Sequence, residues 1–333
     1  MKSSLGRTIA VFLVLPSLLP TLLAVTPLEQ VQSLSYLPPL DLARLKQGEI
    51  VVERGSLGNF PRGVHLQSSY FVRAPLATVG NALLHWDPVK HQDPEVRLYR
   101  EYALPGSVAD FKTLHLQANS PNDKWLLDRT AEIRRDSSTR ELHLTNEEIA
   151  LVHGKDGNTA WQEILRGRAA AFAHGGLAAV PPYWSGEKIS PLSEFRGLLS
   201  LAPKTAKHFE PIINSRPLTA DGNPASEAVP YWEAYVVHGH TTLQLGLFAA
   251  QKADNSWQLI DCVYYPSDTY FMSIDLYQLW PVENGTLVWQ ASFVSALFRS
   301  YLGGADRFVA GKLQAAEAVR TIKEFRAEIE KHR

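Results

Sequence analysis

The two histidines His238 and His240, separated by one glycine, form the most suggestive chemical motif in the sequence. Residues two apart on a β-strand point to the same face, so both imidazoles could bind one metal ion. A zinc site would need a third ligand, for which Glu233, Asp261 and His153 are candidates, and the spacing selects none of them. Solvent-facing or hydrogen-bonded histidines explain the same motif more simply. The sequence therefore predicts no metal site.

Asp261 and Asp275 are the next candidates, because each lies within an apolar, strand-like run. A carboxyl group in such a run either faces solvent or is buried with a partner and has a shifted pKa. Strand alternation favours the solvent-facing position for Asp261, since its neighbours are Ile260 and Cys262. Together with the two histidines, Asp261 defines one functional hypothesis, a metal- or acid/base-assisted hydrolase or cyclase. The sequence has no nucleophile elbow, zinc-protease motif or phosphate-binding loop, so we assign no catalytic residue and no cofactor.

Composition limits the choice of partner. The 333 residues include 33 basic and 34 acidic side chains, for a formal net charge of -1. Nucleic-acid binders usually carry a basic excess or stripe, and neither is present, so nucleic acid is not expected as a partner. Hydrophobic residues make up 45% of the chain, which is typical of a globular protein with a sizeable core. Cys262 is the only cysteine, and its apolar surroundings predict a buried thiol that forms no disulfide.

The N-terminus is typical of an export signal. Lys2 and Arg7 precede an apolar run over 9–25, which is the order of a signal peptide, and we expect this peptide to cover 1–24. Pro16 and Pro20 interrupt the run and disfavour a permanent membrane-spanning helix. The protein is therefore expected to be exported, either periplasmic or secreted. An uncleaved signal that anchors the chain in the membrane is the alternative.

The remaining elements form a strand-rich body with helices in the middle and at the end. An extended lead-in is expected over 25–45, with a short helix at 40–45, and the domain over 46–333. A helix is predicted from Pro75 to about Trp86 and a final helix of about 26 residues after Gly304. Asn284-Gly285 predicts a hairpin turn. Predicted strands cover 48–53, 64–73, 96–104, 124–134, 141–152, 232–247, 257–265, 270–280 and 286–293, and a helical insertion covers 159–217 with helices at 161–172, 191–201 and 204–209.

The apolar stripe of the final helix needs a broad surface, and a curved antiparallel sheet is the natural one. Three segments, 69–79 (SYFVRAPLATV), 280–293 and 303–326, follow the order of an entry strand leading into a helix, a last strand and a closing helix. This order resembles the START-like, or helix-grip, superfamily of lipid-transfer and polyketide-cyclase-like domains. The resemblance implies an α+β fold in which the sheet grips the C-terminal helix. The insertion at 159–217 has no counterpart in that pattern.

A bent sheet cannot contact one helix along its whole length, so the sequence predicts an apolar cavity between them. The expected function is binding of a hydrophobic small molecule or lipid, and the sequence favours this over the hydrolase or cyclase hypothesis without deciding between them. The aromatic residues expected to line this cavity could instead simply form the hydrophobic core. A third hypothesis is a binding module that contacts another envelope protein through 159–217. The candidate ligand-binding residues are Trp232, Tyr235, Phe248, Tyr264, Tyr270, Met272, Trp289, Phe293, Phe308 and Leu313.

Overall fold

The computed structural model describes residues 25–91, 93, 95–135, 141–298 and 305–331. The expected signal peptide at 1–24 lies outside these residues, so export stays a prediction. Among the helices of the described segments, none combines the length and the apolar character needed to cross a bilayer.

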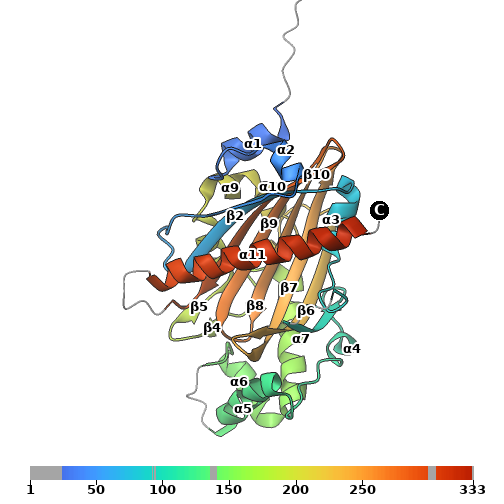
Figure 1. Ribbon diagram of the computed structural model, residues 1–333. Coiled ribbons are helices and arrows are strands. Elements are labelled where there is room, and N and C mark those ends of the chain that lie inside the picture. The colour runs from blue at the N-terminus through green and yellow to red at the C-terminus, as the bar shows by residue number, and fades with distance from the viewer. Residues whose placement is uncertain (1–24, 92, 94, 136–140, 299–304, 332–333) are drawn as a thin grey trace, which may run out of the picture.

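Eight antiparallel strands form one sheet in the order β1-β2-β10-β9-β8-β7-β6-β3 (Figure 1). Strands β6 to β10 follow one another directly, as expected for antiparallel strands joined by short turns. At the β9–β10 turn Asn284 has φ 65°, which agrees with the predicted hairpin. The strands are β1 (Ile50–Arg54), β2 (Gly63–Val72), β3 (Val96–Glu101), β6 (Glu227–Val237), β7 (His240–Ala253), β8 (Ser256–Pro266), β9 (Tyr270–Val282) and β10 (Gly285–Ala296), with β4 (Tyr183–Trp184) and β5 (Lys188–Ile189) as a separate ribbon.

Helix α11 (Ala305–Lys331) crosses one face of the sheet diagonally, and α3 (Leu76–Leu84) lies on the same face (Figure 1). Ile322 and Phe325 of α11 are buried in one cluster with Tyr70 of β2 and Val288 of β10. The predicted α+β fold, with a large antiparallel sheet and a long C-terminal helix, is therefore confirmed at this level.

The remaining helices form a second, larger core with the opposite face of the sheet. Its aromatic contacts join helix to strand, as between Phe172 of α7 and Tyr264 of β8, whose ring centroids are 4.1 Å apart. Cys262 is fully buried in this core, as predicted. The helices are α1 (Pro27–Leu34), α2 (Leu42–Lys46), α4 (Val108–Phe111), α5 (Pro121–Arg135), α6 (Asn146–Gly154), α7 (Gly157–Gly175), α8 (Pro191–Leu199), α9 (Pro203–His208) and α10 (Glu210–Ile213).

The helical region between β3 and β6 begins earlier than 159, at α4. The strands predicted over 124–134 and 141–152 are wrong, because helices α5 and α6 occupy these stretches. In α5 the buried residues Leu126, Thr130 and Ile133 follow helical spacing, which a short apolar run can share with a strand. In α6 a capping box between Thr145 and Glu148 stabilises the first turn. A similar capping box starts α1 inside the lead-in that the sequence analysis expects to be extended.

Candidate functional site

A cavity of about 400 Å³ lies between α11 and the sheet. Its lining comes from α3, from strands β2, β3 and β6 to β10, from the segment that precedes β3, and from α11. None of the lining residues within the described segments comes from α4 to α10. Its apolar side chains include Leu66, Leu83, Phe248, Val294, Ile322 and Phe325.

Two carboxyl groups face each other on the cavity floor. Asp261 of β8 and Asp275 of β9 are paired in register, and Ser292 of β10 continues the same row. The Ser292 hydroxyl donates to Asp275, and the Gln290 amide donates to the same carboxyl oxygen at 2.9 Å. Burial raises the pKa of Asp275, although these two hydrogen bonds oppose the shift. Two carboxyls paired across neighbouring strands repel each other when both are ionised, which disfavours the doubly ionised pair.

A tyrosine hydroxyl contacts Asp261 from two strands away. The Tyr231 hydroxyl on β6 donates to Asp261 at 2.8 Å, although β7 lies between their strands. Gly246 on β7 makes this reach possible, because a Cβ atom there would lie 2.2 Å from the Tyr231 ring. Burial, and then the charge of Asp275, raise the pKa of Asp261 well above its usual range despite the tyrosine hydrogen bond.

Glu233 on β6 is a third acid of the cavity, and no described residue donates a hydrogen bond to it or pairs with it. Its side chain is partly buried between Tyr99 of β3 and Gln244 of β7, the residues opposite it in register. Burial, followed by the charge of Asp93, raises the pKa of Glu233 to about 8. A large fraction of this carboxyl is therefore protonated at neutral pH.

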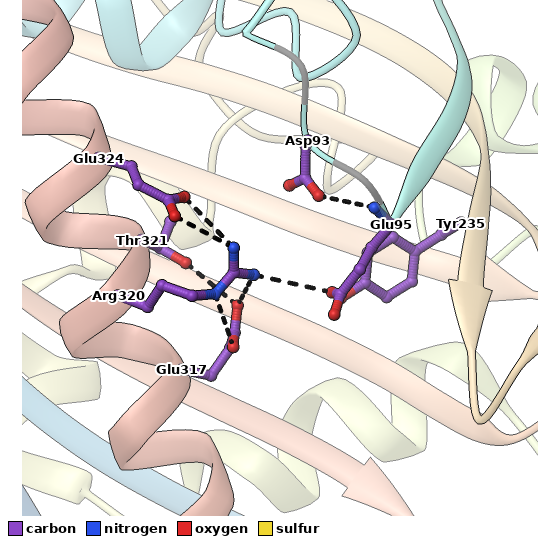
Figure 2. Close-up of polar contacts among 7 residues, drawn as sticks. All are labelled: Asp93, Glu95, Tyr235, Glu317, Arg320, Thr321 and Glu324. Carbon is purple, nitrogen blue, oxygen red and sulfur yellow. Dashed lines mark hydrogen bonds and ion pairs between the residues drawn. The ribbon is translucent and has the colours of Figure 1, made fainter.

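Arg320 of α11 ties the helix to the edge of the sheet across the cavity (Figure 2). Its guanidinium pairs with Glu317 and Glu324 on the same helix and lies 4.0 Å from Glu95. The Tyr235 hydroxyl of β6 donates to the same Glu95 carboxylate at 2.6 Å. Helix α11, which forms the roof of the cavity, is thus held by a polar contact in addition to its apolar packing.

The expected ligand-binding residues divide between the two faces of the sheet. Tyr235 and Phe248 line the cavity. Tyr270 does not; burial, and then the charges of Glu233 and Tyr235, raise its pKa. Five others lie in the opposite core, because strand alternation points them away from α11: Trp232, Tyr264, Met272, Trp289 and Phe293.

The two candidate ligand-binding residues on α11 are not among the described residues that line the cavity. Leu313 is 68% exposed, because it lies on the side of α11 that faces away from the sheet. The placement of the Phe308 side chain lies outside the described part of the structure.

The histidine motif does not form the arrangement that the hydrolase or cyclase hypothesis requires. His238 and Gly239 have φ of 51° and 81° and form the turn between β6 and β7, so the two histidines do not share a strand face. His240 instead contacts Asp268 at 2.6 Å and stacks on Trp125. In the described segments, no group of three His, Cys, Asp or Glu side chains is positioned to hold a metal ion.

The polar residues of the cavity floor were not predicted from the sequence. Strand alternation favoured the solvent side for Asp261, and Glu233 was a candidate only as a third metal ligand, but both residues line the cavity. The available signal was their shared alternation with other polar strand residues, which indicates a common face. Whether that face is open to solvent or covered by α11 is not encoded in the alternation.

No protein-family model matches the chain, and a search of curated proteins finds no match. The function of the cavity must therefore be inferred from its own geometry and chemistry. An apolar wall combined with a few convergent polar groups and shifted pKa values is the usual character of a ligand site.

Replacing Glu233 by glutamine is expected to increase the free energy of unfolding at pH 9 by on the order of 2 kcal/mol. The pKa of about 8 lies above the ordinary 4.5, so the wild-type protein loses stability as the pH rises between these values. Partial burial keeps the effect below the full shift, because solvent screens the charge. Urea denaturation at pH 5 and pH 9 measures the difference. Equal gains at both pH values would contradict a raised Glu233 pKa.

Proposed function

We propose that the chain is an exported START-like, helix-grip protein that holds a hydrophobic small molecule or lipid in the cavity between α11 and the sheet. The order of elements supports this fold, since β2 leads into α3 and the antiparallel strands end in a long closing helix. The observation that carries the function is the cavity itself. Its volume of about 400 Å³ falls within the usual range for small-molecule sites, and its apolar residues provide the burial that drives binding.

Filling the cavity should abolish binding. Ala318 on α11 lines the cavity, so Ala318→Trp is expected to raise the Kd of a bound fluorescent sterol analogue or decanol at least about tenfold by occupying the ligand volume. Leu313→Trp places the same side chain on the exposed side of α11 and is the matched control. Fluorescence titration of delipidated protein measures both. Saturable binding that Ala318→Trp leaves unchanged would place the ligand elsewhere, and no binding across a broad panel would remove the proposal.

Acid/base catalysis in the same cavity is the second candidate, and the facing Asp261 and Asp275 favour it. Two close carboxyls with raised pKa values can share a proton, which is a usual arrangement for a group that donates and accepts protons. This hypothesis replaces the two histidines with Asp275 as the partner of Asp261. Mass spectrometry of a captured host ligand after incubation would detect turnover. The conversion should stop in Asp275→Asn while binding persists.

Contact with another envelope protein through 159–217 stays a separate prediction. In this stretch Trp184 of the β4–β5 ribbon is 50% exposed. Copurification of a partner that Trp184→Ala releases would support it.

A further inference from the structure

Every described residue of the cavity lining that can carry a charge near neutral pH is an acid. Six of its described lining residues are acidic, and none of those lining residues is Lys, Arg or His. Arg320 neutralises part of this charge, because it pairs with Glu317 and lies close to Glu95. It makes no such pair with Glu233, Asp261 or Asp275. The six acidic residues are Asp93, Glu95, Glu233, Asp261, Asp275 and Glu317.

One hydrogen-bond acceptor of the cavity is buried without a donor. The side-chain oxygen of Gln314 on α11 is fully buried and has no donor among the described residues. A buried acceptor without a donor costs about 1–3 kcal/mol, so this oxygen favours an occupant that donates a hydrogen bond. Glu233, on the sheet side, has no hydrogen-bond partner among the described residues and is partly buried.

Aromatic rings adjoin these acceptors. Tyr231 lies between Tyr99 and Phe248, with centroid separations of 5.4 Å on each side, and all three rings line the cavity. The faces of aromatic rings attract cations, most strongly where water is excluded. The same wall therefore combines aromatic faces with carboxyl groups.

We infer that the cavity selects an amphiphilic ligand whose polar end is an ammonium group, bound among Glu233, Asp261 and Asp275, with its apolar body against Leu83, Ile322 and Phe325. This inference rests on the proposed binding function and specifies its ligand class. A primary ammonium supplies both the positive charge and the donors that the cavity lacks, whereas a quaternary ammonium supplies the charge alone. A metal ion fits less well, because the described side chains include no three-residue metal-binding group.

A matched series of probes tests the ligand class. Decyltrimethylammonium, decylamine, decanol and decanoate share one apolar chain and differ at the polar end. Isothermal titration of the full chain should give a Kd for the two cations at least about tenfold below that of decanol, with decanoate weakest. Equal affinity for decanol and the cations, or preference for decanoate, would overturn the inference and leave the binding function standing. Failure of all four probes would overturn both.

Substitutions of the cavity acids test where the cationic group of the ligand binds. At pH 8, Glu233→Gln and the double variant Asp261→Asn with Asp275→Asn should each reduce the preference for decyltrimethylammonium over decanol at least about fivefold, because each removes negative charge from the cavity. Asp254→Asn removes an exposed acid from the β7–β8 turn and is the control for net charge. Cation preference that survives both cavity substitutions, or that falls equally in Asp254→Asn, would contradict this placement.

The pH dependence gives an independent readout, since decyltrimethylammonium does not titrate. Its affinity should rise at least about fivefold between pH 6 and pH 8 as Glu233 ionises, and decanol affinity should stay constant. Cation affinity independent of pH in this window would overturn the role of Glu233. The other titratable groups of the cavity are Asp93, Glu95, Asp261, Asp275, Glu317, Tyr70, Tyr99, Tyr231, Tyr235 and Tyr277.

Discussion

Replacement of Arg168 by methionine is expected to lower the free energy of unfolding by about 3–5 kcal/mol. Arg168 of α7 is only 1% exposed and pairs with Glu148 of α6 at 2.7 Å. It also donates to the Pro181 carbonyl at 2.8 Å, and its guanidinium lies 4.0 Å from the centroid of the Tyr265 ring on β8. Removing it leaves a buried carboxylate without its cationic partner and the Pro181 carbonyl without the guanidinium donor, which costs more than the original pair contributes. Urea denaturation measures the change.

Two controls separate the buried pair from the loss of a charge. The double variant Arg168→Met with Glu148→Gln should recover part of the lost stability, because no uncompensated carboxylate remains and glutamine keeps the capping box with Thr145. Lys124→Met breaks an exposed pair with Asp128 on α5 and should change stability by less than about 0.5 kcal/mol. An Arg168→Met protein as stable as wild type would contradict the proposed importance of this contact between the insertion and the sheet.

Phe325→Ala is expected to cost about 3–5 kcal/mol and to loosen α11 in particular. Phe325 is 4% exposed and packs against Trp86, with ring centroids 5.3 Å apart, so the smaller side chain leaves a void between helix and sheet. Because α11 is the roof of the cavity, hydrogen exchange of its amides should speed up more than that of β9 or β10. The expected result is a protein that folds but binds its ligand more weakly.

Leu313→Ala is the matched control on the same helix. Its side chain is exposed, so the substitution should leave both stability and exchange close to wild type. Equal effects of the two substitutions would mean that α11 does not dock through the face that contains Phe325.

Several parts of the fold could be predicted because their signals are local. The stripe that includes Ile322 and Phe325 predicted both the last helix and its need for a broad apolar surface, and both residues are buried as that requires. The Asn284 turn was predictable from its dipeptide. Local reasoning failed for α5 and α6, where short apolar runs fit strand and helix spacing equally well.

The candidate site was predictable only in outline. A cavity beneath the last helix was expected, and Tyr235 and Phe248 line it. Large aromatic residues such as Trp289 were expected beside them, yet they pack against the insertion helices on the other side, where Phe209 contacts Trp289. Because both faces of this sheet are covered, size and hydrophobicity do not distinguish a cavity wall from a core.

The α+β class, the positions of most strands and the closing helix could be predicted from the sequence alone. So could the alternation that places every second residue of a strand on the same face. Which face of the sheet α11 covers became clear only in the folded structure. The covered face includes Glu233, Asp261 and Asp275, which therefore line a cavity and do not face bulk solvent. These two properties differ because they depend on interactions of different range along the chain. Alternation is set by neighbouring residues, whereas the covering of a face depends on strands far apart in the chain, such as those joined by the Ser69 to Val288 hydrogen bond.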